Sequence, residues 1–187
     1  MKERDLKKEL IRFTKLLSEK GLITGAEGNL SIKTNKGFWI TPTGRIKEVI
    51  KEKDLCFIDE NGNFITGKPS SEWGMHFLIY KKNKRAKAVV HTHPIYGLCL
   101  NNLGFDFKKF SLKEAELILG HIITVPYYEP GSYELWEVTS DLACIYKVLF
   151  LEKHGLVTVG ETLEEAVNLA LIFEKLCKIE YKIKSLK

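Results

Sequence analysis

Two histidines with one residue between them, His91 and His93, follow a short apolar stretch of the chain. On a β-strand, residues two apart point to the same face, so both imidazoles are expected to aim at one spot. Imidazole nitrogens are common zinc ligands, and two of them on one strand form half of a zinc site. A His-x-His pair also occurs at ordinary strand ends, so a third ligand is needed to decide between these interpretations.

The candidate for the third ligand is His154, which lies in a tight turn between two expected strands. Gly155 follows it and allows the backbone to bend away while the imidazole is presented outward. Three neutral imidazoles leave open positions on zinc, the arrangement of catalytic rather than structural zinc sites. The other two histidines have simpler interpretations. His76 is expected on a helix surface, four residues after Glu72, and His121 is expected in a strand or loop without a role.

Three short segments offer polar side chains and free backbone N–H groups, which are typical of anion sites. They are residues 28–29, residues 41–44 and residues 70–71, the last just before an expected helix. Glu72 lies at the start of that helix, where the helix dipole favours a carboxylate. Each segment alone is typical of an ordinary turn. Three of them in one chain with a metal-type histidine set favour a site for an anionic group.

The spacing of apolar residues predicts the elements that must hold these side chains. Helices are expected at residues 2–20, from Ser70 or Ser71 to about 80, after Pro94, at 132–146, and from Thr162 to about 184. Thr162 forms a capping box with Glu165 at the start of the last helix. Strands are expected at 29–33, 37–41, 55–59, 64–65, 87–92, 148–151 and 156–159. Strands joined by hairpins and interleaved with helices predict a largely antiparallel sheet covered by helices.

The composition predicts one soluble domain over residues 1–187, long enough for a core without disulfides. The net charge of +5 is spread along the chain, whereas nucleic-acid binding needs a concentrated basic face, so no nucleic-acid partner is expected. No apolar run approaches membrane-spanning length, so no membrane partner is expected either. Four widely spaced cysteines and an N-terminus without an apolar stretch predict a cytoplasmic protein with reduced thiols.

Five motifs resemble, in chain order, those of the class II, zinc-dependent sugar-phosphate aldolases of the L-fuculose-1-phosphate aldolase type. They are Gly28-Asn29-Leu30-Ser31, Thr41-Pro42-Thr43-Gly44, Lys68-Pro69-Ser70-Ser71-Glu72-Trp73, His91-Thr92-His93 and His154-Gly155-Leu156. His-x-His alone is a weak signal, whereas the ordered set is specific and covers most of the chain. The resemblance implies a three-layer α/β/α domain with a mostly antiparallel central sheet. It also implies a homotetramer with active sites between subunits.

The resemblance further implies a role for each matching residue. His91, His93 and His154 match the zinc ligands, and Glu72 matches the catalytic carboxylate, which can also contact the metal. The pocket for the substrate phosphate matches Gly28, Asn29, Thr43, Gly44, Ser70 and Ser71. The implied reaction cleaves a ketose 1-phosphate, such as L-fuculose 1-phosphate, to dihydroxyacetone phosphate and a small aldehyde. In this reaction Zn²⁺ stabilises an enediolate by polarising its oxygen, and the carboxylate moves a proton.

The chain departs from this family at its general acid. Fuculose-phosphate aldolases use a tyrosine in the stretch corresponding to residues 111–116, where this chain has none, and Glu114 or Tyr128 could substitute. Alternatives on the same scaffold are methylthioribulose-1-phosphate dehydratase and ribulose-phosphate 4-epimerase, although the epimerase pattern has Asp where Glu72 stands. A non-catalytic domain like the adducin head is a further alternative, but such domains lose the metal ligands that this chain keeps.

Overall fold

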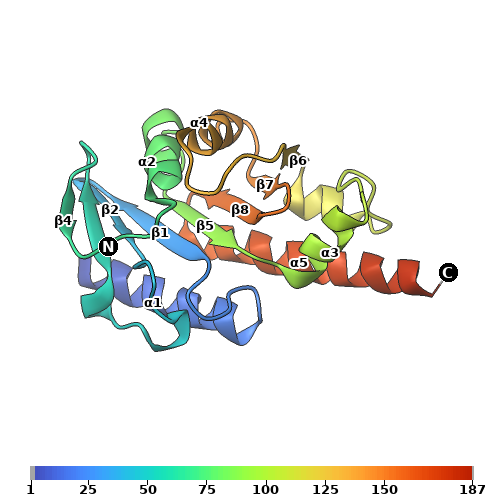
Figure 1. Ribbon diagram of the computed structural model, residues 1–187, viewed down its shortest axis with the longest axis horizontal. Coiled ribbons are helices and arrows are strands. Elements are labelled where there is room, and N and C mark those ends of the chain that lie inside the picture. The colour runs from blue at the N-terminus through green and yellow to red at the C-terminus, as the bar shows by residue number, and fades with distance from the viewer. Residues whose placement is uncertain (1–2, 187) are drawn as a thin grey trace.

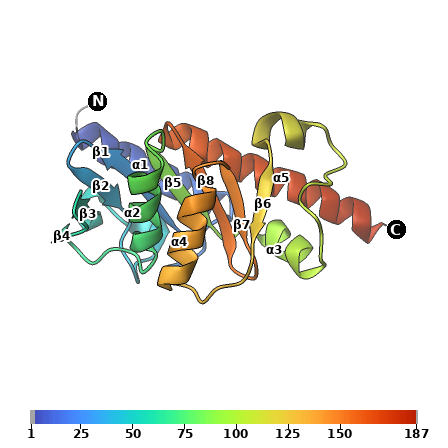
Figure 2. The ribbon, with the colours of Figure 1, turned by 90° about the horizontal axis from the view of Figure 1, so that it is seen from above.

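In the computed structural model, which describes residues 3–186, an eight-stranded sheet lies between two layers of helices (Figure 1; Figure 2). One face is covered by α2 (Trp73–Lys82) and α4 (Tyr133–Leu142). The other face is covered by α1 (Glu3–Glu19), α3 (Ile95–Asn102) and α5 (Leu163–Ser185), and α5 extends beyond the edge of the sheet. The three-layer α/β/α fold predicted from the sequence is therefore confirmed.

The strands follow the order β4-β3-β2-β1-β5-β8-β7-β6 across the sheet. All neighbouring strands pair antiparallel except β6 and β7, which are parallel, so the predicted mostly antiparallel sheet is also confirmed. In chain order the strands are β1 (Asn29–Thr34), β2 (Gly37–Ile40), β3 (Cys56–Asp59), β4 (Phe64–Thr66), β5 (Ala88–Thr92), β6 (Ile122–Val125), β7 (Val148–Leu151) and β8 (Gly155–Gly160). Short helical turns lie at η1 (Lys47–Val49), η2 (Glu52–Asp54) and η3 (Ala115–Leu119), the last a π-helix.

Alternation along the strands divides the hydrophobic core into two clusters, one on each face of the sheet. Val90 of β5 packs in the cluster with α1 and α5, whereas Val89 packs in the cluster with α2 and α4. In the register between β1 and β5, Ser31 lies opposite Val89 and Asn29 lies opposite His91. Directly opposite residues share a face. These polar side chains therefore lie on the face of the sheet that α2 and α4 cover.

Some element boundaries differ from the sequence expectation. Neither Ser70 nor Ser71 is the N-cap of α2, because that helix begins at Trp73 with Glu72 in the cap position and no side-chain cap. The Ser70 hydroxyl instead accepts a hydrogen bond from the Glu72 N–H at 3.3 Å, in a turn before the helix. Helix α4 ends at Leu142, earlier than expected, and β6 and η3 were not expected at all. Within residues 3–186, no helix has both the length and the apolar character needed to cross a bilayer.

Candidate metal centre and anion site

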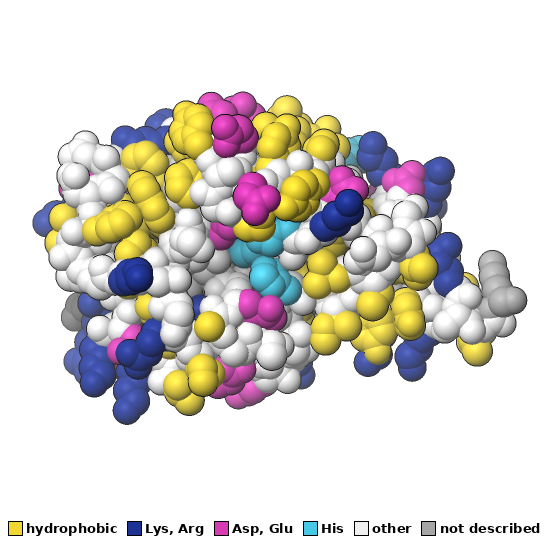
Figure 3. Space-filling model, viewed as in Figure 1, with side chains coloured by type: hydrophobic (Ala, Val, Ile, Leu, Met, Phe, Trp, Pro, Cys, Tyr) yellow, Lys and Arg dark blue, Asp and Glu magenta, His cyan; other side chains and the backbone are white. Residues whose placement is uncertain are grey.

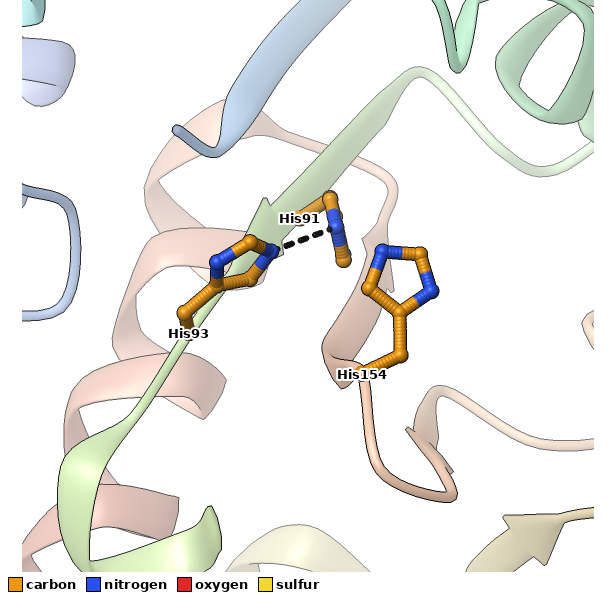
Figure 4. Close-up of side chains that lie close together, drawn as sticks. All are labelled: His91, His93 and His154. Atoms are coloured by element: carbon orange, nitrogen blue, oxygen red, sulfur yellow. Dashed lines mark hydrogen bonds between the residues drawn. The ribbon is translucent and has the colours of Figure 1, made fainter. Parts of the chain in front are cut away.

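The three histidines named as candidate ligands converge at one end of β5 (Figure 4). His91 lies in β5, His93 follows it, and His154 lies in the turn between β7 and β8. Because β8 pairs with β5, this turn adjoins the end of β5. The ring centroids lie 4.9 to 5.6 Å apart, and one nitrogen of each ring lies within 4.8 Å of the others. One ion could therefore contact all three rings.

Gly155 permits this close approach of the turn to β5. A Cβ atom at that position would lie 2.5 Å from the Thr92 carbonyl oxygen and 2.7 Å from Cδ2 of His93. Both distances are shorter than real Cβ contacts, and the first is to backbone, which cannot move aside as a flexible side chain can. Any larger residue here would push the turn, and His154 with it, away from the other two histidines.

Hydrogen bonds determine which ring nitrogens face the cluster. Nδ1 of His91 lies 3.1 Å from the Leu156 carbonyl oxygen, which can only accept, so this nitrogen carries the proton. Nδ1 of His93 likewise donates to Oε2 of Glu27 at 3.0 Å. In the neutral rings the two Nε2 atoms are then unprotonated, yet they lie 3.1 Å apart. Two lone pairs at this distance repel each other unless a cation lies beside them, so the arrangement fits a metal ion.

The environment also keeps the imidazoles of His91 and His154 in the neutral form that binds metals. Burial, together with the nearby His93 and His154, holds the pKa of His91 well below its usual value. Burial lowers the pKa of His154 to about 4. Near neutral pH both rings are therefore uncharged and offer lone pairs.

Glu27 is a part of the site that the sequence did not indicate. Both of its carboxylate oxygens are used, because Oε1 accepts from the Thr24 N–H at 3.0 Å and Oε2 accepts from His93. A carboxylate behind a metal-binding histidine fixes the orientation of the ring and makes it a stronger ligand. The chain separation of 66 residues between Glu27 and His93 hides this contact from any local sequence pattern.

We expect Glu27→Gln to weaken metal binding by about 10- to 100-fold, the usual effect of losing such a supporting carboxylate. Glutamine has one oxygen acceptor, whereas Glu27 uses two, so either the ring of His93 or the 24–27 turn loses its partner. Competition with a fluorescent zinc chelator measures the affinity. Glu19→Gln, at an exposed position at the end of α1, is the control. Equal affinities for both variants would show that Glu27 does not support the ligand.

Glu72 lies beside the histidine cluster and is buried, with 5% of its surface exposed. Oε1 lies 4.0 Å from Nε2 of His154, and Oε2 accepts a hydrogen bond of 3.3 Å from the indole N–H of Trp136 on α4. Burial raises the pKa of Glu72, while the bonds from Trp136 and the backbone of Gly131 oppose that rise. The side chains of His93 and His154 are 22% and 10% exposed, so the cluster is reachable from solvent. Figure 3 shows histidine side chains in a hollow with acidic side chains beside them.

The segments named as an anion site adjoin one another in the fold. The Thr41 N–H donates to the Leu30 carbonyl at 3.0 Å, and the Leu30 N–H donates to the Thr41 hydroxyl at 3.2 Å. The Thr43 N–H donates to the Lys68 carbonyl at 3.2 Å, and Pro42 and Pro69 form an isolated bridge. These bonds join the start of β1, the 41–44 turn and the 68–71 turn.

Two glycines of these segments have backbone conformations that favour glycine. Gly28 and Gly44 both have φ of +64°. At Gly28 a Cβ would also lie 3.1 Å from the His91 carbonyl oxygen, so the turn is packed against β5. Asn29 comes next and lies opposite His91, whereas Ser71 is exposed. The candidate anion site thus adjoins the candidate metal centre.

The two residues considered as general acids lie in different places. Glu114 pairs with Lys175 of α5 at 3.0 Å, on the side of the sheet away from α2. Tyr128 packs against the cluster that α2 and α4 share. It precedes Gly131, where a Cβ would lie 3.9 Å from the Ser71 carbonyl oxygen. Within one chain, Tyr128 is therefore on the side of Glu72, and Glu114 is not.

His76 was expected on a helix surface, and that expectation is wrong. Its exposed fraction is 0%, because this side of α2 faces the sheet. Helix α2 is apolar on several sides, so the sequence offers no polar face from which to read the orientation of the helix. His121 is exposed, outside the cluster.

Comparison with known proteins gives consistent similarities. A family model described as the class II aldolase and adducin N-terminal domain matches residues 8–181. The L-fuculose phosphate aldolase of Methanococcus maripaludis strain C7 is 38% identical over 182 residues, covering 96% of this chain and 99% of the relative. The 3-oxo-tetronate 4-phosphate decarboxylase of Escherichia coli K12 is 33% identical over 172 residues, covering 89% and 81% of the two chains.

Among solved structures, YgbL of Klebsiella pneumoniae has the same fold. Its TM-score is 0.90 at 30% identity, and the match covers 98% of this chain and 91% of that one. YgbL is described as an aldolase, an epimerase or a decarboxylase, without a choice among the three activities.

Proposed function

The chain belongs to the class II aldolase and adducin N-terminal domain family, and from this premise we propose that it is a metal-dependent lyase acting on a sugar phosphate. The observation that carries the proposal is the convergence of His91, His93 and His154 beside the buried carboxylate of Glu72. Relatives named L-fuculose phosphate aldolase support the finer assignment. This is cleavage of a ketose 1-phosphate, such as L-fuculose 1-phosphate, to dihydroxyacetone phosphate and a small aldehyde.

We propose that the three histidines hold a divalent cation. Zinc is the cation we propose, because it suits three imidazole ligands. Glu72 is close enough to His154 to serve as an additional ligand before substrate arrives. When bound, such a cation supplies Lewis acidity, which polarises a substrate oxygen next to the bond that breaks. The turn residues Asn29, Thr43, Ser70 and Ser71, with the backbone at Gly28 and Gly44, would hold the substrate phosphate beside it.

Glu72 is the residue that we propose moves a proton. Cleavage breaks a carbon–carbon bond: the hydroxyl of the departing aldehyde gives up its proton, and the carbon next to the carbonyl, which keeps the electron pair, must take one up. The hydrogen bond from Trp136 holds Oε2 of Glu72, so Oε1 is the atom available to exchange a proton with substrate. Burial favours the protonated carboxyl and so makes Glu72 a stronger base than an exposed glutamate.

The decisive experiment is a screen of the purified, metal-loaded protein against phosphorylated ketoses, with coupled detection of dihydroxyacetone phosphate. We expect turnover of a ketose 1-phosphate. The similarity to a 3-oxo-tetronate 4-phosphate decarboxylase, together with the missing tyrosine at residues 111–116, supports decarboxylation as a second candidate. Release of carbon dioxide from a 3-oxo-tetronate 4-phosphate, with no dihydroxyacetone phosphate formed from any ketose, would favour the second candidate over the first.

We expect Ser71→Ala to weaken the binding of inorganic phosphate by about tenfold, since a hydrogen bond to a charged group contributes about 1.5 kcal/mol or more. Ser71 is exposed next to the Glu72 N-cap, so its loss should leave the melting temperature nearly unchanged. Isothermal titration calorimetry of the metal-loaded protein measures the affinity. Ser185→Ala, at the exposed end of α5, is the matched control. Unchanged phosphate affinity in the Ser71 variant would remove this residue from the pocket.

We also propose a homotetramer with sites between subunits. Two apolar side chains of η3, Leu117 and Ile118, are 83% and 41% exposed. Glu114 lies away from the Glu72 of its own chain, so it could serve only the site of a neighbouring subunit. Sedimentation equilibrium would give the number of subunits. A cytoplasmic location stays a prediction from the cysteine pattern.

A further inference from the structure

His76 lies in the middle of a buried chain of polar groups that links α2 to the start of β1. Its Nε2 lies 2.6 Å from Oδ1 of Asn29, and its Nδ1 lies 2.6 Å from the Ser31 hydroxyl oxygen. That oxygen lies 2.7 Å from the Tyr80 hydroxyl, one turn further along α2. All four residues are at least 96% buried, so these bonds are shielded from water.

The direction of these hydrogen bonds follows from the atoms involved. The amide oxygen of Asn29 can only accept, so the Nε2–H of His76 is the donor. In a neutral ring Nδ1 is then unprotonated and accepts from the Ser31 hydroxyl, whose oxygen is left to accept from the hydroxyl of Tyr80. Burial lowers the pKa of His76 to about 3, so the ring keeps this neutral form at all pH values near neutrality.

The bond from His76 sets the orientation of the Asn29 side chain. An asparagine amide can rotate by half a turn, which exchanges its oxygen and its nitrogen. The two orientations differ strongly for an anion, because the nitrogen donates to phosphate whereas the oxygen repels it. With the oxygen engaged by His76, the nitrogen is the end left for a ligand. Asn29 also lies opposite His91, beside the candidate metal centre.

We propose that His76 is a positioning residue that locks the Asn29 amide with its N–H groups toward the substrate phosphate. The inference rests on the proposed phosphate pocket and adds a residue that does not itself touch substrate. It also gives a reason for a fully buried histidine in α2, which the proposed chemistry does not otherwise use. A buried histidine with a purely structural role would stabilise the fold without this effect on anion binding.

Two substitutions separate the roles of the two ring nitrogens. The amide of a glutamine reaches the place of Nε2, whereas that of an asparagine reaches only the place of Nδ1. His76→Gln can thus keep a donor for Asn29, and His76→Asn cannot. We expect His76→Asn to weaken inorganic phosphate binding by about tenfold, with a rise in KM and little change in kcat. His76→Gln should stay within about threefold of the wild type.

Ser31→Ala is the matched control, because it breaks the other end of the same buried chain and leaves the bond to Asn29 intact. We expect it to lower the melting temperature while phosphate affinity stays within about threefold of wild type. Asn29→Ala should weaken phosphate binding as much as His76→Asn does, and the double variant should bind no more weakly than either. Additive losses, equal losses in both His76 variants, or wild-type affinity in His76→Asn would overturn the inference.

A spectroscopic test needs no variant and so does not depend on variant folding. In ¹⁵N spectra of histidine-labelled protein, His76 should carry its proton on Nε2, and inorganic phosphate should shift the side-chain amide signals of Asn29. A proton on Nδ1 would reverse every bond in the chain and overturn the inference. If the wild type binds no phosphate at all, the proposed pocket fails and the inference fails with it. If phosphate shifts Asn29 but the tautomer is reversed, only the role of His76 fails.

Discussion

Glu72→Gln is expected to lower kcat/KM by a factor of about 10² to 10⁴, the range of positioned acid–base catalysis, while one equivalent of metal stays bound. The change keeps the shape of the side chain and can keep an oxygen for the indole N–H of Trp136, so the local structure should persist. It removes the basicity, because an amide does not accept a proton near neutral pH. Three imidazoles remain to hold the ion.

The measurement combines steady-state kinetics with metal analysis of the same sample. Glu60→Gln, at an exposed position in the β3–β4 turn, is the control and should have wild-type kinetics. Turnover of the Glu72 variant within about threefold of wild type, with metal retained, would assign the proton transfer to another residue. Glu114 would be the first to examine, as a residue contributed by a neighbouring subunit.

His154→Ala should have a different signature, in which metal and activity are lost together. The variant leaves two imidazoles, and loss of a direct ligand should weaken metal binding by more than the roughly 10- to 100-fold typical of a supporting residue. His91 and His93 would then face each other with no ion to separate their lone pairs. We therefore expect less than one equivalent of metal after dialysis and no measurable turnover.

His121→Ala is the control for this experiment, because His121 is exposed and outside the cluster. Metal analysis after dialysis, with circular dichroism to verify folding, compares the two variants. A folded His154→Ala protein that retains a full equivalent of tightly bound metal would show that the ion is held elsewhere. Together, the Glu72 and His154 variants separate holding the metal from moving the proton.

The parts of the site that lie within continuous motifs could be predicted from the sequence. The alternation of a strand is enough to place His91 and His93 on one side, and the turn before Gly155 marks His154. The predicted hairpins appear as β1–β2 and β3–β4, because their turn residues are local signals.

The parts that depend on contacts between distant segments could not be predicted. Glu27 supports His93 only because the loop before β1 contacts the end of β5. No residue spacing in the sequence predicts this contact. Trp136 reaches Glu72 across the packing of α4 against α2. His76 was misplaced for a related reason, since α2 is apolar on most sides and has no distinct polar face to reveal its rotation. Strand β6 is a four-residue parallel edge strand, too short to give a clear pattern.

The position of the candidate ligands along the chain has a consequence for folding. His93 and His154 enclose α3, η3, β6, α4 and β7, so an ion bound to both would close a loop around about a third of the molecule. In the unfolded chain these ligands are far apart, and metal binding then stabilises the native state by mass action. Metal supply would therefore set the lifetime of the protein as well as its activity, because the metal-free form opens more often to proteases.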